Sequence, residues 1–321
     1  MRIKLTSIFS TVALALSIGL PVRADKWVPS ETFPFEYKIG KRDGDWYGLR
    51  FDLTSVSLEL VNVVELLNAD GSSKGGIRTG EGRATFLRYS LEDLWAEVSE
   101  DPRVIAAIPI GYAERANVPD LAGLIIQSGE PRSPIMMART LTALACINSL
   151  DSLRPPFYLP ISYDPGQAYG YLPFGDLSVV DNTEGLLTSC VDGIQIGPRL
   201  LEPEQGSQSI QPSRSSEIDV EDGRNSLFRR LIMVRDASNR LSFAVFDQPV
   251  MLNTVFTSIS KGSDALLTCQ SEMGDCSEMA LVATSYEHVG IYFRPNSDSI
   301  NATFYGNTKA PIPAAIVIRR K

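Results

Sequence analysis

Residues 104–129 read VIAAIPIGYAERANVPDLAGLIIQSG. Two apolar runs, Val104–Pro109 and Leu121–Gln127, lie on either side of a more polar stretch that begins at Gly111. Each run is short, rich in Ile, Val and Leu, and bounded by glycine, proline or polar residues, which favours a buried strand over a helix. The segment therefore predicts two strands joined by a turn.

Strand signals continue on both sides of this segment. The clearest alternation of apolar and polar residues is Val56–Val63. The other predicted strands are Tyr47–Leu53, Leu231–Val234, Leu241–Phe246, Met279–Thr284, Gly290–Phe293 and Ala314–Ile318. No internal repeat and no shift in composition divides the chain. We therefore expect an α+β fold, a single domain with a mixed, mostly β-sheet core and a few packing helices.

Three helices are predicted. Ser90 and Asp93 have the spacing of a capping box, and Leu91, Leu94, Trp95 and Val98 follow on one apolar stripe. Segments Pro134–Ser149 and Pro249–Ser260 also have a helical pattern, and each opens with a proline that the first turn of a helix tolerates.

Two segments depart from this pattern. Residues 154–175 are rich in Pro, Tyr and Phe, which predicts either a cover for a sheet edge or an aromatic loop that stacks on sugar rings. Residues 202–226 are polar, with many Ser, Gln and Glu, and predict a surface excursion.

The N-terminus has the three parts of a secretory signal peptide. Arg2 and Lys4 precede an apolar stretch, Leu5–Leu20, and Val22 and Ala24 are the small residues that a signal peptidase reads. We expect residues 1–24 to be removed after Ala24, and residues 25–321 to form a periplasmic or secreted protein. A retained membrane anchor is the alternative, but the apolar stretch is shorter than the roughly 20 residues that span a bilayer.

Charge and composition exclude several classes of function. The chain has 30 Lys and Arg against 38 Asp and Glu, and loss of Arg2, Lys4 and Arg23 takes its net charge from -8 to -11. An acidic protein of this kind is not expected to bind nucleic acid. The single histidine, His288, rules out a multi-histidine metal centre, and it is more simply explained by packing or exposure than by catalysis. No metal or cofactor is expected, and the oligomeric state is left open.

Four cysteines in an exported chain predict two disulfides. Three pairings are possible. We favour Cys146–Cys190 with Cys269–Cys276, because the second pair closes a short loop without long-range constraint. Free thiols, one of them a nucleophile, are the alternative, although no histidine partner is visible in the sequence.

Five segments, in order over residues 104–318, resemble the phosphodiester glycosidase family. Residues 104–129 are similar to its buried strand, glycine-aromatic turn and Pro-x-Gly-Leu-x-Ile-x-x-Gly strand. Gln195–Leu201 is similar to Gln-x-Gly-Pro-x-Leu, and Arg229–Asp236 to its Arg-Thr-x-x-Gly strand. Asp264–Leu267 and Pro311–Ile318 are similar to its Ala-Leu-Asn-Leu segment and its closing strand. Residues 25–103 would supply the leading strands and first helix of one domain over 25–321.

The departures from the family pattern lie where its chemistry lies. The family's turn asparagine is Pro109 here and its second aromatic residue is Ala113. Its Asp-Gly-Gly-Gly-Ser loop has no counterpart in residues 268–277, which hold one glycine, Gly274. The arginine has a match in Arg230, or in Arg229 in the other register.

The best-known relatives in this family remove the N-acetylglucosamine that covers mannose 6-phosphate, so the resemblance implies a glycan or sugar-phosphate substrate. Cleaving a sugar phosphodiester needs a cation for the phosphate and a carboxylate that moves a proton. The resemblance implies Arg230 as the cation and Glu114, Glu272 or Asp275 as the acid, with Gly111, Tyr112 and Arg229 contacting substrate. For each charged residue, a solvated or structural role is the alternative.

Two functional hypotheses follow. The first is an exported enzyme that hydrolyses a sugar phosphodiester or glycosidic bond. The second is a catalytically degenerate protein, either a periplasmic or surface glycan-binding module or an envelope interaction protein. Loss of the Asp-Gly-Gly-Gly-Ser loop favours the second hypothesis, and the retained framework favours the first.

Overall fold

The computed structural model describes most of the chain that follows the predicted signal peptide. The described residues are 27–38, 46–63, 77–78, 84–85, 89–115, 118–138, 140–151, 155–162, 170–202, 211–212, 227–236, 238–260, 266, 279–285, 289–294 and 303–321. The predicted signal peptide, Glu272, Asp275, His288, Cys269 and Cys276 lie outside them.

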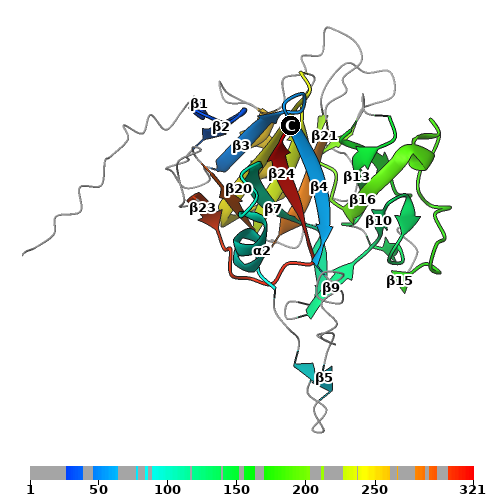
Figure 1. The fold of residues 1–321 in the computed structure, drawn as a ribbon. Coiled ribbons are helices and arrows are strands. Elements are labelled where there is room, and N and C mark those ends of the chain that lie inside the picture. The colour runs from blue at the N-terminus through cyan, green and yellow to red at the C-terminus, as the bar shows by residue number, and fades with distance from the viewer. Residues whose placement is uncertain are drawn as a thin grey trace, which may run out of the picture.

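Three antiparallel sheets form the framework (Figure 1). The first sheet has the order β1 (Val28–Pro29), β2 (Phe35–Lys38), β3 (Tyr47–Asp52), β20 (Arg240–Val250), β19 (Phe228–Arg235) and β21 (Met279–Ser285). The second has the order β23 (Thr303–Gly306), β22 (Gly290–Phe293), β7 (Val104–Ile110), β24 (Ala314–Arg320) and β4 (Val56–Asn62). The third has the order β11 (Glu130–Pro131), β10 (Ile125–Gln127), β16 (Cys190–Ile196), β13 (Ala143–Ser149) and β14 (Phe157–Pro160).

Four short ladders complete the strands. They pair β12 (Met136–Met137) with β15 (Gly170–Tyr171), β17 (Leu201–Glu202) with β18 (Gln211–Pro212), β5 (Ile77–Arg78) with β6 (Ala84–Thr85), and β8 (Tyr112–Arg115) with β9 (Val118–Ala122). The predicted mostly β core is therefore confirmed, and every strand pair in the described part of the chain is antiparallel.

One hydrophobic core lies between the three sheets. It takes mostly alternate residues of the strands, such as Ile108 and Ile110 of β7, Leu231 and Met233 of β19, and Ala145 of β13. The opposite face of each sheet has its own cover. Helix α4 (Leu252–Ser260) packs on the first sheet, and helix α2 (Leu91–Val98) packs on the second. The segment that ends in the 3-10 helix η1 (Leu186–Ser189) packs on the third.

Helix α2 confirms the capping-box prediction. The Ser90 hydroxyl accepts a hydrogen bond from the Asp93 amide at 3.2 Å, and Asp93 accepts one from the Ser90 amide at 2.8 Å. Leu91, Leu94 and Trp95 are buried against β7 and its neighbours. Because α2 covers the outer face of β7, both faces of that strand are apolar, as its sequence VIAAIPI indicated.

Two helix predictions need correction. Pro134–Ser149 is not a helix, since it contains β12 and β13. Ala143 and Ala145 face the central core while Leu144 and Cys146 face the outer cluster, so burial on both faces removed the polar alternation that marks a strand. In Pro249–Ser260 the helix starts only at Leu252, because Pro249 still belongs to β20.

The aromatic segment 154–175 is partly a sheet edge. Residues Phe157–Pro160 form β14, the edge strand of the third sheet, and Gly170–Tyr171 pairs with β12. The polar excursion 202–226 lies almost wholly outside the described residues, apart from Glu202 and Gln211–Pro212.

Candidate functional site

Arg230 is the largest fully buried side chain among the described residues, at 1% exposure. It lies on β19, on the face of the first sheet that packs against α4. Its Nε donates a hydrogen bond to the Val250 carbonyl at 3.3 Å, and its guanidinium lies 5.4 Å from the centre of the Phe228 ring. Burying a guanidinium costs several kcal/mol, by order of magnitude, unless other groups compensate its charge. A position of this kind therefore requires an anionic or strongly polar partner, either in the protein or in a ligand.

Both strands beside Arg230 depart from regular pairing. On β20, Phe228 pairs with Val250 but Arg230 pairs with Phe246, so β20 has two residues more than regular pairing needs. On β21, Leu231 pairs with Thr284 and Ile232 with Val282, which leaves Ala283 without a partner on β19. Such bulges bend a strand and redirect its side chains, and they are common beside functional sites.

The Gly111–Tyr112 turn docks at the second of these irregularities. The Gly111 amide donates a hydrogen bond to the Ala283 carbonyl at 2.9 Å, and Gly111 has a positive φ of 86°. Gly111 therefore meets β21 at Ala283, two residues along the strand from Ser285, which is the partner of Arg230. The structure brings these predicted site residues to the same part of the first sheet.

Tyr112 is held by the motif that resembles Gln-x-Gly-Pro-x-Leu. Its hydroxyl donates a hydrogen bond to the Gly197 carbonyl at 2.6 Å. Gly197 and Pro198 in turn exchange backbone hydrogen bonds with Val282 of β21, both at 3.1 Å. A side chain at Gly197 would place its Cβ 2.6 Å from the Thr140 carbonyl oxygen, and φ there is 146°, so only glycine fits.

Arg229 occupies a different environment. It is partly exposed, and its Nε lies 4.0 Å from Asp247 Oδ1, whose carboxylate is also partly exposed. An exposed pair at this distance contributes about 0–1 kcal/mol. Of the two arginines that the motif could designate, Arg230 is the buried one.

The predicted acids are Glu114, Glu272 and Asp275. Glu114 lies in β8, whose backbone pairs with β9 just after the Gly111–Tyr112 turn. Glu272 and Asp275 lie outside the described residues. Their roles, and that of Glu114, stay predictions. In the described part of the chain no group of three or more Asp, Glu, Cys and His side chains has the arrangement of a metal site.

Gln195 entered the sequence analysis only as the first residue of the segment similar to Gln-x-Gly-Pro-x-Leu, and its side chain was given no role. Its fully buried amide accepts hydrogen bonds from the backbone of Leu124 and Met136, both at 3.0 Å. It donates to the carbonyls of Met136 at 2.7 Å and Leu141 at 2.8 Å. Gly123, at φ 110°, makes room for it, because a Cβ there would lie 2.6 Å from Gln195 Oε1. The sequence signal for this role was a glutamine between two isoleucines of a strand, where a buried polar side chain needs hydrogen-bond partners. The residues that carry the family resemblance here are thus part of the framework.

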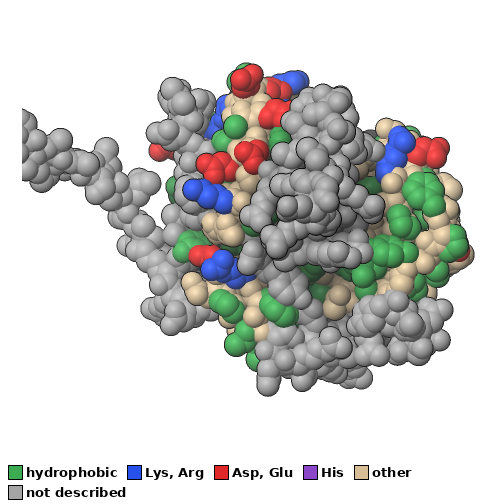
Figure 2. All heavy atoms as spheres, turned by 90° about the horizontal axis from the view of Figure 1, so that it is seen from below, with side chains coloured by type: hydrophobic (Ala, Val, Ile, Leu, Met, Phe, Trp, Pro, Cys, Tyr) green, Lys and Arg blue, Asp and Glu red, His purple; other side chains and the backbone are tan. Residues whose placement is uncertain are grey.

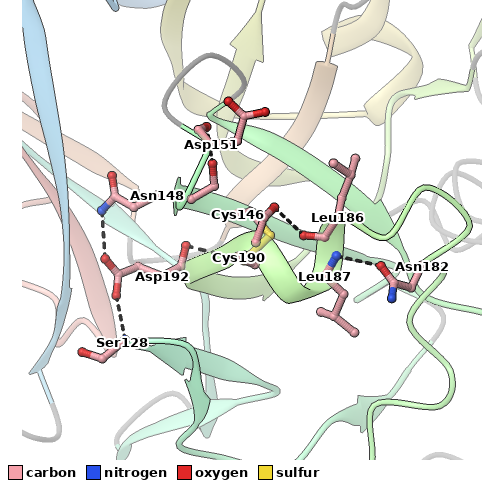
Figure 3. Close-up of a disulfide and its surroundings, with 11 residues drawn as sticks. Ser128, Cys146, Asn148, Asp151, Asn182, Leu186, Leu187, Cys190 and Asp192 are labelled. Atoms are coloured by element: carbon pink, nitrogen blue, oxygen red, sulfur yellow. Dashed lines mark hydrogen bonds between the residues drawn. A yellow bond between two sulfur atoms is a disulfide. The ribbon is translucent and has the colours of Figure 1, made fainter.

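Cys146 and Cys190 form a disulfide, as predicted (Figure 3). Both are buried in the cluster between the third sheet and its outer cover. Nearby, Asp192 accepts hydrogen bonds from Asn148 at 2.9 Å and from the Ser128 amide at 3.2 Å. The disulfide is structural and remote in sequence from Arg230.

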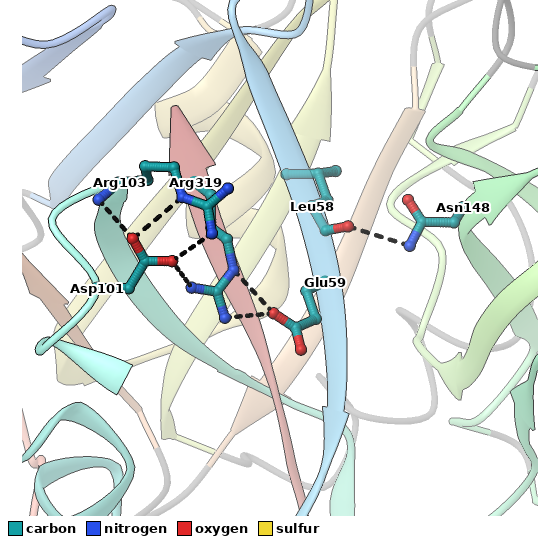
Figure 4. A network of polar contacts seen from close by, with 6 residues as sticks. All are labelled: Leu58, Glu59, Asp101, Arg103, Asn148 and Arg319. Atoms are coloured by element: carbon teal, nitrogen blue, oxygen red, sulfur yellow. Dashed lines mark hydrogen bonds and ion pairs between the residues drawn. The ribbon is translucent and has the colours of Figure 1, made fainter. Parts of the chain in front are cut away.

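A polar network lies on the second sheet (Figure 4). Arg319 of β24 contacts Glu59 of β4 at 2.6 Å and Asp101 at 3.1 Å, and Arg103 contacts Asp101 at 2.8 Å. Hydrogen bonds from Arg103 are the main cause that lowers the pKa of Asp101 to about 2. This network is formed within the chain and fixes the turn before β7 to the far edge of the sheet.

The fold defines the chain as a mostly antiparallel β protein with a buried arginine beside a glycine turn. No protein-family model and no curated protein matches the chain. Among solved structures, it is similar to a hypothetical protein from Synechocystis, with a TM-score of 0.50 and 10% identity over 89% of this chain. The match spans 62% of that protein, less than two thirds of its length.

A second similar structure is the catalytic domain of zebrafish N-acetylglucosamine-1-phosphodiester alpha-N-acetylglucosaminidase, auto-inhibited by its pro-peptide. It has a TM-score of 0.47 and 13% identity, over 91% of this chain and 85% of that one. The relationship is distant and concerns the fold, and at 10–13% identity site residues do not transfer. Among the described residues, no helix is long and apolar enough to cross a membrane.

Proposed function

We propose that this chain is an exported, glycan-directed protein of phosphodiester glycosidase type, which hydrolyses a sugar phosphodiester or a glycosidic bond. The observation that carries the proposal is the environment of Arg230. A buried guanidinium lies between two irregular strands and across β21 from a glycine turn. The ordered sequence resemblance over residues 104–318 supports the choice of chemistry.

In this proposal Arg230 neutralises the phosphate. A guanidinium offers parallel N–H donors that match two phosphate oxygens, and a low dielectric strengthens that interaction. The Gly111 turn lets the backbone approach the sugar without steric conflict. Since Arg230 is 1% exposed, a ligand reaches it only when the atoms that cover it move aside.

The acid is the less defined part of the proposal. Glu114 follows the Gly111–Tyr112 turn by two residues and is our first candidate for proton transfer to the leaving oxygen. Glu272 and Asp275 are the replacements that the sequence offers for the missing Asp-Gly-Gly-Gly-Ser acid. Because that loop is replaced in residues 268–277, a glycan-binding protein or an envelope interaction protein without turnover is the alternative function.

Turnover tests the enzyme hypothesis. Residues 25–321 should release free sugar, or p-nitrophenol, from a sugar phosphodiester substrate. Arg230→Ala should lower that rate by about a hundredfold, the usual loss when a group that stabilises developing charge is removed. Arg230→Lys retains the charge but not the paired donors, so its turnover rate should lie between those of the unchanged protein and of Arg230→Ala.

Two controls separate function from folding. Arg320→Ala removes an exposed arginine at the end of β24 and should leave turnover unchanged. Thermal unfolding of each variant shows whether it is folded. A folded Arg230→Lys protein with unchanged turnover would contradict the role of Arg230. Stabilisation by sugar phosphates without any turnover would favour the binding alternative.

A further inference from the structure

The surface of the protein offers mixed charge to a phosphate group. On the face shown in Figure 2, Lys and Arg side chains lie beside Asp and Glu side chains, and the whole chain has 30 basic against 38 acidic residues. In the proposed function a phosphodiester therefore depends on Arg230 and on the groups held around it. The contacts that hold the Gly111 turn at β21 bear directly on that function.

The outer edge of β21 changes its partner at the bulge. Up to Val282 this edge pairs with residues 197–200, here called the edge segment, and the Gly197 amide donates to the Val282 carbonyl at 3.1 Å. At the bulged residue, Ala283, the carbonyl instead accepts a hydrogen bond from the Gly111 amide at 2.9 Å. The turn is therefore attached where the ladder between β21 and the edge segment ends, and backbone bonds at such an end open most readily.

Tyr112 closes a ring of hydrogen bonds around this junction. Its hydroxyl donates to the Gly197 carbonyl at 2.6 Å, and the amide of the same Gly197 donates to Val282. Because Tyr112 directly follows Gly111 and Val282 directly precedes the bulge, these bonds join the turn, β21 and the edge segment in one closed ring. A closed ring limits the position of the turn more narrowly than a single bond does, since each bond is directional.

The side chain of Tyr112 is engaged inside the protein at both its ring and its hydroxyl. The ring is partly buried and packs against the apolar cluster between the first sheet and α4, as well as against Ala122, Ala138 and Leu141. A phenol has one proton to donate, and the bond to Gly197 uses it. While the ring of bonds is closed, this hydroxyl holds the turn and has no proton to donate to a substrate.

We propose that Tyr112 is a positioning residue for the proposed Arg230 site. By bonding Gly197, Tyr112 holds the Gly111 turn at the bulge of β21. The turn sets how closely the backbone approaches a sugar, and it sets the start of β8, the strand that contains Glu114. The effect on turnover rests on the proposed function, whereas the effect on the turn does not.

Amide hydrogen exchange measures the effect on the turn. Tyr112→Phe removes one oxygen atom and keeps the aromatic ring. The Gly111 amide should then exchange about three- to tenfold faster, which corresponds to the net contribution of one hydrogen bond to local stability. The Leu200 amide, which donates to the Ala280 carbonyl at 2.9 Å further along β21, is the internal reference and should keep its exchange rate.

Steady-state kinetics measure the effect on turnover. With the sugar phosphodiester substrate that tests the proposed function, Tyr112→Phe should lower kcat by about tenfold and leave KM within about twofold, because a displaced turn disturbs reaction geometry more than affinity. Loss of a direct contact made equally to substrate and transition state would instead raise KM and leave kcat unchanged. Tyr89→Phe is the matched control. It removes a tyrosine hydroxyl that donates to Glu97 on α2, and it should change neither exchange at Gly111 nor turnover.

The outcomes separate this inference from the proposed function. The thermal midpoint of each variant shows whether it is folded. Unchanged exchange at Gly111, or an equal acceleration at Leu200, would overturn the positioning role, and so would faster exchange at Gly111 with unchanged kcat in an active enzyme. If the unchanged protein hydrolyses no sugar phosphodiester, the proposed function fails, whereas faster exchange at Gly111 alone would still support the role of Tyr112 in holding the turn.

Discussion

Gln195 illustrates how one polar side chain fixes the packing of an apolar region. Its four hydrogen bonds all go to backbone groups of the segment 124–141, at Leu124, Met136 and Leu141. An amide that bonds four buried groups holds them at one separation and one angle, because each bond is directional. Arg230 differs, since it buries a charged guanidinium, whose Nε donates to the Val250 carbonyl and which lies 5.4 Å from the centre of the Phe228 ring.

Replacing Gln195 should strongly destabilise the protein. Gln195→Leu keeps the volume but leaves buried amides and carbonyls without partners, each of which costs about 1–3 kcal/mol. We expect the free energy of unfolding to fall by roughly 3 kcal/mol or more. Urea denaturation measures the change. Gln248→Leu, at an exposed position of β20, should change it by less than about 0.5 kcal/mol. Similar losses for both variants would contradict the role of the Gln195 bonds.

At the scale of elements, polar contacts join strands that are distant in the sequence. Arg319 and Glu59 link β24 to β4 across their shared ladder, while Asp101 links the same arginine to the turn before β7. Because these groups are partly exposed, their contacts contribute little to the free energy of unfolding, and their main effect is to orient the strands and the turn that they join. The bulges beside Arg230 act at the same scale, since the extra residues of β20 and β21 set where that side chain points.

The Asp101 contacts should make stability depend on pH. A carboxyl whose pKa is about 2 in the folded protein and about 4 when unfolded stabilises the fold above pH 4. That contribution is lost as the pH falls from about 4 through 2. Asp101→Asn should therefore lower the thermal midpoint at neutral pH and flatten its dependence between pH 4 and 2. The variant Glu100→Gln, at the exposed neighbour, should change the profile less. An unchanged slope in Asp101→Asn would be evidence against the network.

At the scale of the whole molecule, three sheets share one core and each outer face needs a separate cover. Two covers are helices, and the third is an irregular segment held by a disulfide. An irregular cover has few backbone bonds of its own, so the cross-link limits the conformations available to the unfolded chain.

Removing this disulfide should therefore cost more than removing the other predicted one. Cys146→Ala with Cys190→Ala opens a loop with a sequence separation of 44, worth roughly 4 kcal/mol in the chain-entropy model. Cys269→Ala with Cys276→Ala opens a much shorter loop and should cost roughly 2 kcal/mol. Denaturation under non-reducing conditions compares the two. Mass mapping that found Cys269 and Cys276 as free thiols would refute their pairing, and the second variant would then have little effect.

The sequence alone predicted features that depend on neighbours along the chain. The Ser90 capping box, the alternating strand Val56–Val63 and most of the other strands need only local geometry, so they are found where local pattern placed them. The pairing of Cys146 with Cys190 was favoured by loop length and is present. The predicted signal peptide and the segment that holds Glu272 and Asp275 lie outside the described residues, so export and the roles of these two acids stay predictions.

Tertiary structure decided what depends on contacts between distant segments. Segment 143–149 is a strand whose two faces are buried, one by the core and one by the outer cover. Because both faces are apolar, its sequence lacks the alternation of apolar and polar residues that marks a half-buried strand. Likewise, the burial of Arg230, the bulges on its neighbours and the four bonds of Gln195 arise only when segments far apart in the sequence meet. Periodicity is a local property, whereas burial and register belong to the assembled sheets.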